Sequence, residues 1–348
     1  MKGKLSKMNS YERVMGCFSG EKPDRVPIIP MVREWCSKQA GIKFVDEMTN
    51  VEKHVYAQYY CTRKFGYDCV WDLEGVHAES EAMGSKLKFG ENCIPTITDP
   101  AIKDYKEDLH KLKILNPYKD GRLPLILEGI MRLKELCDGE IPVIGYVQCP
   151  FRHAAMLRGL ESFMRDLYKD KENARKLLEI ALDSLIVWGV AVVQAGADLV
   201  MLSDPVSSGD MVSPKLFSEF SLPYTKRLCQ AIKKTGVKVF MHICGDTSDR
   251  FEMLASTEVD CLSLDSKVDF ALAREKLGPD YLLLGNVDPT NPLTLGTPEM
   301  VYEHSKKVIE QAGMDGHFIL SGGCLIPDEV PAENMEAMIR AGREIGRY

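Results

Sequence analysis

The chain lacks the positive charge that marks proteins which bind nucleic acid. Its 348 residues include 44 Lys and Arg against 51 Asp and Glu, for a formal net charge of −7. A protein that follows a phosphate backbone presents a basic surface or stripe, and none is visible in this sequence. We therefore expect no nucleic-acid partner.

Long hydrophobic runs are also missing. The first residues, MKGKLSKMNSYERVMG, carry positive charge but no apolar core of the kind found in a signal peptide. The most apolar stretch, 184–204, is interrupted by Gln194 and Asp198, and it falls short of the ~20 apolar residues that cross a bilayer. The sequence predicts a cytoplasmic protein with no membrane segment, in which this stretch forms a buried helix, a turn at Gly196 and a buried strand.

The chain has 11 cysteines, too few and too scattered for a disulfide scaffold in a protein of this size. No two of them form a CxxC pair. Five lie within apolar patterns, where cysteine usually packs as a small hydrophobic residue: Cys17, Cys61, Cys69, Cys229 and Cys261. A chemical role must therefore be argued for individual cysteines.

Eight short apolar runs recur along the chain and alternate with helical segments. They cover residues 26–30, 68–73, 142–147, 198–203, 237–242, 260–265, 281–286 and 317–322. Continuous apolar runs suit parallel strands that are buried on both faces. The pattern predicts an α/β fold, a (β/α)8 TIM barrel formed by residues 1–348 as a single domain. A doubly wound sheet would fit the alternation as well, but it does not require eight strands. No G-x-G-x-x-G follows the first run, which weakens a dinucleotide-binding interpretation.

Two segments add to the predicted barrel. Residues 1–25, with a helix over about 9–19, form an N-terminal cap. Residues 76–140 form an insertion after the second strand, with a hairpin that turns near Gly90 and an amphipathic helix that ends near Gly139. We expect this insertion to elaborate a barrel loop.

Polar and metal-binding residues stand where the predicted strands end, which is the edge where TIM barrels carry their active sites. They are Arg33, Asp72, Glu74, Asp204, His242, Cys244, Asp265, Asn286 and Cys324. Side chains two apart on a strand point the same way, so His242 and Cys244 share one face. One imidazole and two thiolates would suit zinc, with Asp265 as an occasional fourth ligand. The alternative is a hydrogen-bonded core histidine beside two buried thiols, because H-x-C alone is a weak motif.

Several longer segments resemble the uroporphyrinogen decarboxylase superfamily. These are YERVMGCFSGEKPDRVPIIP near the start, then ADLVMLSDPVSSGDMVSPKLFSEFSLPY, HICGDTSDRFEML, GNVDPTNPLTLGTPEMV and SGGCLIPDEVPAENMEAM. The resemblance covers nearly the whole chain and implies a TIM barrel. The metal-free decarboxylases of this superfamily bind their substrate with an RQAGR segment. The corresponding MVREWCSKQAGIKF keeps Arg33 and lacks the second arginine.

The other branch of the superfamily contains zinc methyltransferases that act with corrinoid proteins. The resemblance implies that His242, Cys244 and Cys324 bind Zn²⁺, and that a partner protein supplies the corrinoid. Members that methylate a thiol such as coenzyme M usually have glycine after the late cysteine, where this chain has Leu325. This departure favours an O-demethylase, which moves the methyl of a phenyl methyl ether to the cob(I)amide of a corrinoid protein. Transfer from a methylcorrinoid protein to a thiol is the close variant.

Further expectations complete this prediction. Asp204, Asp265, Asn286 and Arg33 are expected to orient the substrate or the zinc ligands. Residues 76–140 and 205–213 are expected to receive the corrinoid protein, and a homodimer is possible. Two alternatives stay open: a metal-free decarboxylase, and a non-catalytic protein that carries corrinoid or a thiol.

Overall fold

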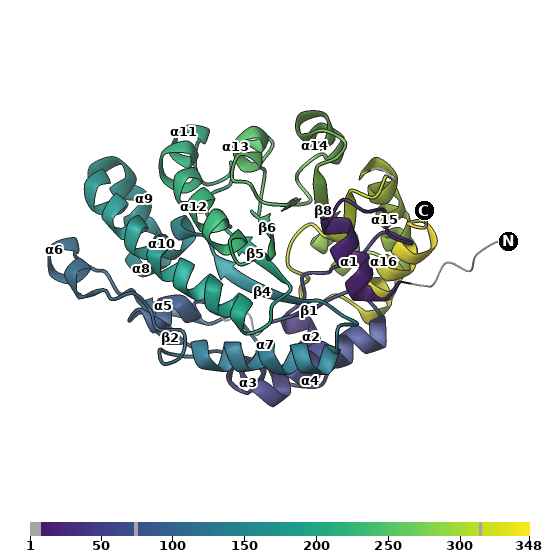
Figure 1. Ribbon diagram of the computed structural model, residues 1–348, viewed down its shortest axis with the longest axis horizontal. Helices are drawn as coiled ribbons and strands as arrows, with labels where there is room; N and C mark the ends of the chain where they lie inside the picture. Colours follow the sequence, from purple (N-terminus) through teal and green to yellow (C-terminus); the bar gives the residue numbers. More distant parts are fainter. Residues whose placement is uncertain (1–7, 73–75, 313–314) are drawn as a thin grey trace.

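A computed structural model describes residues 8–72, 76–312 and 315–348, and it contains a seven-stranded parallel sheet wrapped by helices (Figure 1). Glu74, predicted at a strand end, and the first seven residues of the predicted cap lie outside these ranges. The strand order is β1-β4-β5-β6-β7-β8-β9. The bounds are β1 Val70–Trp71, β4 Val143–Gln148, β5 Leu199–Ser203, β6 Lys238–His242, β7 Cys261–Ser263, β8 Leu282–Val287 and β9 Phe318–Gly322.

Burial on both faces explains why these strands read as continuous apolar runs. All residues of β4, β5, β8 and β9 are buried. The parallel register places Ser203, His242 and Ser263 side by side on three neighbouring strands. The carboxyl ends of the strands therefore meet at one edge, here called the rim.

The first predicted strand, 26–30, closes the barrel without becoming a regular strand. Ile28 forms a single parallel bridge with Leu320 of β9, and its carbonyl oxygen accepts from the Asp68 amide at 2.7 Å. Pro27 and Pro30 have no N–H to donate, which limits ladder formation in this segment. The barrel class is confirmed, but the prediction of eight regular strands was wrong at this position. The second strand is also shorter than predicted.

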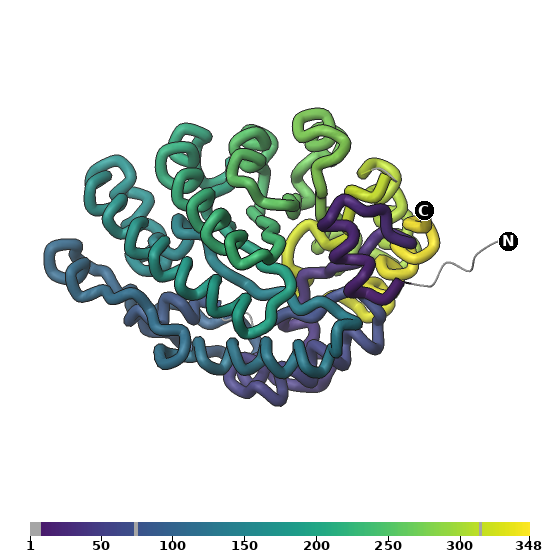
Figure 2. Tube along the Cα trace, viewed as in Figure 1, coloured from purple at the N-terminus to yellow at the C-terminus, as the bar shows by residue number. Residues whose placement is uncertain are grey.

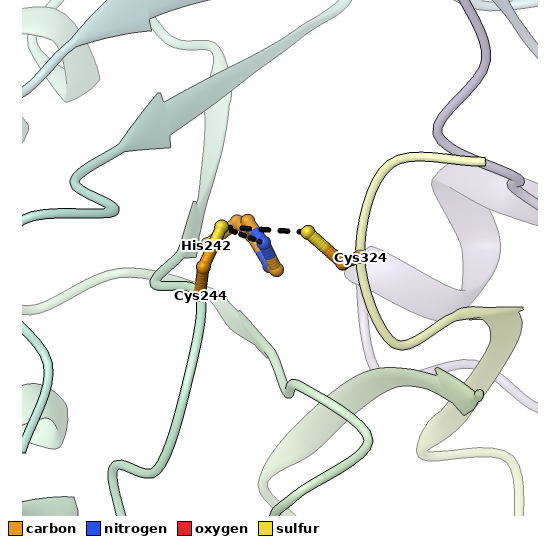
Figure 3. A group of neighbouring side chains, drawn as sticks. All are labelled: His242, Cys244 and Cys324. Carbon is orange, nitrogen blue, oxygen red and sulfur yellow. Dashed lines mark hydrogen bonds between the residues drawn. The ribbon is translucent and has the colours of Figure 1, made fainter. Parts of the chain in front are cut away.

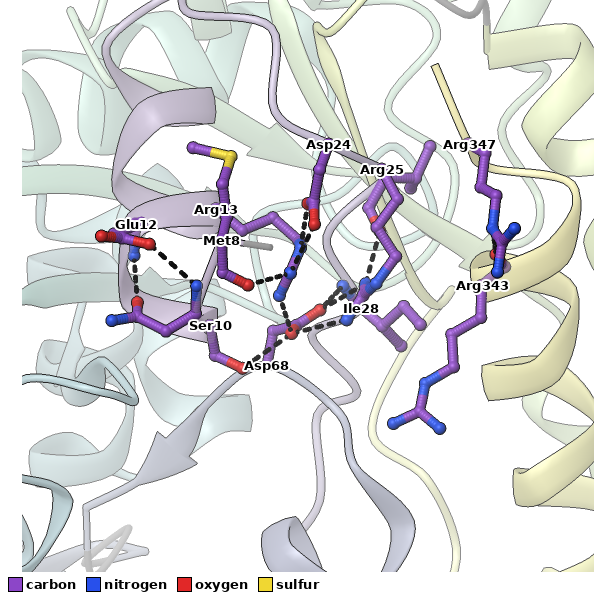
Figure 4. A network of polar contacts seen from close by, with 12 residues as sticks. Met8, Ser10, Glu12, Arg13, Asp24, Arg25, Ile28, Asp68, Arg343 and Arg347 are labelled. Carbon is purple, nitrogen blue, oxygen red and sulfur yellow. Dashed lines mark hydrogen bonds and ion pairs between the residues drawn. The ribbon is translucent and has the colours of Figure 1, made fainter. Parts of the chain in front are cut away.

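A buried carboxylate joins the closing segment to the sheet. Asp68 is fully buried, and its oxygens accept from the Ile28 amide at 2.8 Å and the Ser10 hydroxyl at 2.8 Å. The Arg13 and Arg25 guanidiniums lie 2.9 and 2.7 Å from the same carboxylate (Figure 4). The charge network thus fixes the cap, the closing segment and the start of β1 to one another.

Helices cover the outside of the sheet, and the first and last of them lie together (Figure 2). The N-terminal ones are α1 Ser10–Phe18, α2 Glu34–Gln39, α3 Phe44–Thr49, α4 Val51–Phe65, α5 Ala78–Ala82, α6 Tyr105–Asp108, η1 Leu109–Lys111 and α7 Leu123–Cys137. Then follow α8 Pro150–Arg158, α9 Leu160–Lys169, α10 Lys171–Gln194, α11 Pro214–Leu216, η2 Phe217–Ser221, α12 Leu222–Lys233, α13 Phe251–Ala255, α14 Phe270–Leu277, η3 Pro289–Thr294, α15 Pro298–Ala312 and α16 Ala332–Glu344.

The predicted cap helix and insertion elements are present. Asn9 caps α1 by accepting from the Glu12 amide at 2.8 Å. The Glu12 side chain accepts from the Asn9 amide in turn, which completes a capping box. The hairpin pairs β2 (Lys86–Lys88) with β3 (Thr96–Asp99), and α7 is the amphipathic helix. The hairpin brings Ile94 to the rim, where it borders a cavity.

Among the described residues, α10 is the one helix long and apolar enough to cross a membrane. One face of this helix packs inward, where Leu177, Leu182 and Trp188 are all buried. The turn at Gly196 (φ +116°) then leads into buried β5, as the sequence predicts. Core helices of this kind meet the same length and composition criteria, so the helix is weak support for a membrane span.

Candidate metal centre

Three side chains converge at the rim from two distant parts of the chain. His242 ends β6, Cys244 follows two residues later, and Cys324 stands two residues beyond β9. His242 Nε2 lies 3.3 Å from Cys244 Sγ, which lies 3.4 Å from Cys324 Sγ (Figure 3). Within the described part of the chain, these form the one group of three or more His, Cys, Asp or Glu side chains with ligand atoms within 4.8 Å of one another.

The donor set and its spacing fit zinc. Tetrahedral Zn²⁺ with typical bond lengths places two thiolate sulfurs about 3.8 Å apart and a nitrogen and sulfur about 3.6 Å apart. The observed separations, 3.4 and 3.3 Å, are a few tenths of an ångström shorter. The other imidazole nitrogen, Nδ1, lies 3.0 Å from Ser263 Oγ on neighbouring β7. This contact orients the ring so that Nε2 faces the two sulfurs.

The electrostatics of the cluster favour a thiolate. The hydrogen bond from Cys244 lowers the pKa of Cys324 to about 4, and His242 contributes in the same direction. The same contact raises the pKa of Cys244. Burial works against a charged His242, but the bond to Cys324 and its negative charge raise the imidazole pKa. The site therefore stabilises negative charge on sulfur, which is the form that binds metal.

Two predicted site residues hold the backbone around the cluster. Asp265 Oδ2 accepts from the Gly245 amide at 2.8 Å, directly after Cys244, while Oδ1 accepts from the Lys267 amide at 3.0 Å. Asn286 Nδ2 donates to the carbonyl oxygens of Asp265 and Val268 at 3.0 and 2.8 Å. The structure does not bring Asp265 into the group of ligand atoms.

Asp204 lies behind the rim. Its side chain is fully buried, and Oδ2 accepts from Ser221 Oγ at 3.1 Å. Burial raises the pKa of this carboxyl to about 7. The flanking residues Ser203 and Pro205 border the cavity at the rim, but Asp204 does not. Its side chain contacts helix segment η2 instead.

A cavity of about 330 Å³ opens above the cluster. Its walls are mainly apolar, with His242, Cys244 and Cys324 on one side, and Arg33 is the other predicted residue that borders it. The apolar wall is formed by Met31, Val32, Trp71, Val76, Ile94, Met201, Pro205 and Leu325. The volume falls in the range of small-molecule sites, which run from about 300 to 1,000 Å³.

Sequence reasoning missed two polar residues of this cavity, Arg152 and His77. Arg152 extends from the first turn of α8, donates to Ser203 Oγ at 3.2 Å and also bonds Tyr146 Oη. His77 lies across the cavity, where burial and the nearby Arg152 lower its pKa to about 4. The signal for Arg152 was available, since it follows Pro150 at the start of a helix directly after a predicted strand. His77 had no comparable signal.

The chain is similar to proteins of known family and structure. The family model described as uroporphyrinogen decarboxylase (URO-D) matches residues 9–345. The methylcobamide:CoM methyltransferase MtbA of Methanosarcina acetivorans is 29% identical over 97% of this chain and 99% of its own length. The methylated-thiol–coenzyme M methyltransferase of Methanosarcina mazei is 30% identical over 78% of this chain and 72% of its own. A solved structure described as a methyltransferase from Methanosarcina mazei matches with a TM-score of 0.89 and 25% identity, over 97% of this chain and 99% of that one.

Proposed function

This chain belongs to the uroporphyrinogen decarboxylase family, and we propose that it is a zinc-dependent member that moves a methyl group between a corrinoid protein and a small thiol. It is a methyltransferase. The observation that carries the zinc assignment is the convergence of His242, Cys244 and Cys324 at the rim, with their ligand atoms within 4.8 Å. A metal-free decarboxylase has no use for this set of two thiols and an imidazole.

Each residue of the site has a distinct role in the proposed reaction. His242, Cys244 and Cys324 would hold Zn²⁺, which acts as a Lewis acid that lowers the pKa of a thiol at its open position. Ser263 orients the His242 ring, and Asp265 fixes the turn after Cys244. The apolar wall of the cavity excludes water from the reacting sulfur, which strengthens the electrostatic interactions there.

The polar side chains of the cavity favour a substrate with negative charge. Arg33 and Arg152 border the same cavity as the cluster. Arg33 also pairs with Glu34 at 3.0 Å, and Arg152 also bonds Tyr146 and Ser203. Their positive charge would attract a carboxylate, sulfonate or phenolate. The relatives named for coenzyme M support a thiol as the methyl acceptor. We therefore place an anionic thiol in the cavity, with its sulfur toward Cys244 and Cys324.

The predicted O-demethylase activity remains a second candidate. Leu325 follows Cys324 and borders the cavity, beside the ring of Trp71 and other apolar side chains. This wall would accommodate the aromatic ring of a phenyl methyl ether. The two activities share the zinc ligands and the corrinoid partner and differ in the direction of transfer.

The corrinoid protein must reach the cavity from the rim. The 76–140 insertion borders it through Ile94 and His77, and the 205–213 loop through Pro205. We propose these segments as the docking surface. A cytoplasmic location and a homodimer remain predictions, the latter testable by sedimentation velocity.

Metal content tests the proposal. Chelator-free wild type should contain about one zinc per chain, and Cys324→Ala should lose zinc or bind it much more weakly. Cys93→Ala is the matched control, because Cys93 is exposed and lies outside the cluster. Zinc-free wild type that takes up no added zinc would refute the metal site.

Turnover assays distinguish the two directions of methyl transfer. Zinc-loaded enzyme is mixed with methylcobalamin and a thiol such as coenzyme M, or with cob(I)alamin and a phenyl methyl ether. Demethylation of methylcobalamin by the thiol supports the main proposal, and methylation of cob(I)alamin by the ether supports the second candidate. Activity that is unchanged in Cys324→Ala contradicts both.

A further inference from the structure

A second cavity lies on the opposite face of the barrel from the rim. It measures about 680 Å³ and is bordered by α1, the end of α4, the segments that precede β1 and β4, the last turn of α16 and the residues after it. Five arginines border it: Arg13, Arg25, Arg63, Arg343 and Arg347. This face of a TIM barrel usually serves stability, and the proposed methyl transfer uses none of these residues.

Three of the five arginines have carboxylate partners. The pairs are Arg13 with Asp24 at 2.6 Å and with Asp68 at 2.9 Å, Arg25 with Asp68 at 2.7 Å, and Arg63 with Glu140 at 3.3 Å. Asp24, Asp68 and Glu140 are the acidic side chains that border the cavity. The five guanidiniums outnumber the three side-chain carboxylates, on a chain whose net charge is −7.

The excess charge resides on Arg343 and Arg347. Arg343 Nη2 donates to the Gly66 carbonyl oxygen at 2.7 Å, and Arg347 Nε donates to the Arg343 carbonyl oxygen at 3.1 Å. Neither has an ion pair with a carboxylate among the described residues, and Figure 4 draws both on the C-terminal segment of the chain. Both side chains are exposed at the surface. Desolvation and the nearby Arg25 and Arg13 lower the pKa of Arg343, while Asp68 acts in the opposite direction. An anion between these guanidiniums would relieve that repulsion.

We propose that this arginine cavity binds a small phosphorylated molecule through Arg343 and Arg347. A phosphoryl group carries up to two negative charges near neutral pH, and it would give Arg343 and Arg347 the counter-charge that no neighbouring side chain in the described part of the chain supplies through an ion pair. Its oxygens accept from several directions at once, and the planar guanidinium fork bonds them in pairs. The cavity volume suits a ligand of small-metabolite size. The site is independent of the methyl-transfer centre.

Isothermal titration of the full-length chain with inorganic phosphate, pyrophosphate and succinate tests the proposal. Pyrophosphate should bind one-to-one, and the R343Q/R347Q variant should bind it at least about ten-fold more weakly, since charge-assisted bonds contribute this much. Succinate has a similar charge but no phosphoryl group, and it should bind more weakly than pyrophosphate. R340Q is the matched control: Arg340 is exposed on α16, its guanidinium lies over the Tyr302 ring, and it does not border the cavity.

Three results would overturn the proposal. The first is that wild type shows no saturable binding of phosphate or pyrophosphate at millimolar concentrations. The second is that R340Q and R343Q/R347Q lose affinity for pyrophosphate equally. The third is that succinate binds as tightly as pyrophosphate. Thermal unfolding of each variant, followed by circular dichroism, verifies that the chain is folded in every titration.

Discussion

Ser263 determines which nitrogen of His242 faces the two sulfurs. With zinc on Nε2, the proton resides on Nδ1 and is donated to Ser263 Oγ, 3.0 Å away. Contacts of this kind typically contribute 10- to 100-fold to metal affinity. We predict that Ser263→Ala weakens zinc binding by roughly this factor, as measured by competition with a chelating dye.

Ser256→Ala is the control for this prediction, because the exposed Ser256 hydroxyl donates to the nearby Met253 carbonyl oxygen and lies outside the cluster. It should leave zinc affinity unchanged. Equal affinities for wild type and Ser263→Ala would show that the hydroxyl does not orient the ligand.

Asp204 makes stability depend on pH. Its pKa is about 7 in the folded protein, raised by burial from an ordinary value of 3.8. Below pH 3.8 both the folded and unfolded chains hold this proton. Between pH 3.8 and 7 the unfolded chain has lost it and the folded chain keeps it, so the free energy of unfolding falls as pH rises through this window. The free energy of unfolding falls by at most about 4 kcal/mol over this window.

Asp204→Asn should remove this slope. Urea unfolding of wild type and variant across the window measures the difference, and the variant should gain stability relative to wild type toward pH 8. Asp183→Asn, an exposed site on α10, should keep the wild-type slope. If the free energies of unfolding of wild type and Asp204→Asn change with pH in parallel, the raised pKa of Asp204 is contradicted.

At the scale of elements, the turn after β6 carries the H-x-C motif. Gly245 has φ +89°, and a Cβ there would lie 2.4 Å from Asp210 Oδ2. Gly236, at the other end of β6, has φ +91° with nothing within 4 Å of the same position. Alanine at either site meets the backbone penalty of about 1 kcal/mol.

We predict that Gly245→Ala costs more stability than Gly236→Ala and weakens zinc binding as well. The added methyl displaces the Asp210 carboxylate, which accepts from the Asp246 amide in the turn that Asp265 holds through the Gly245 amide. Urea unfolding of the metal-free proteins and the chelator competition measure the two effects. Equal zinc affinities in both variants would show that the turn does not position Cys244.

The periodicity of the sequence predicts some contacts of the site and not others. Alternation along a strand placed His242 and Cys244 on one face from the sequence alone. Arg152 lies on the helix after β4 and enters the cavity through its contacts with Ser203 and Tyr146. Such a contact depends on how α8 packs over β5, which no local pattern encodes.

For the whole molecule, barrel closure depends on Asp68. Asp68→Asn would leave the buried Arg13 and the partly buried Arg25 guanidinium without this counter-charge, which costs about 3–5 kcal/mol for a buried pair. We predict a loss of this size in the free energy of urea unfolding. Asp46→Asn removes an ion pair with Lys53 whose side chains are both more than a third exposed, and it should change stability little. Similar effects of the two substitutions would rule out closure by the Asp68 network.

The sequence by itself determined the barrel class, seven of its strands and the three converging candidate ligands, because buried parallel strands and strand-end residues follow local periodicity. Tertiary structure decided the rest. It reduced residues 26–30 to a single bridge, because Pro27 and Pro30 cannot extend the ladder. It turned Asp265 to the backbone and Asp204 inward, and it brought Arg343 and Arg347 to the cavity that Asp68 also borders. Each of these depends on which distant groups meet, and hydrogen-bond satisfaction and charge balance are settled only when the chain has folded.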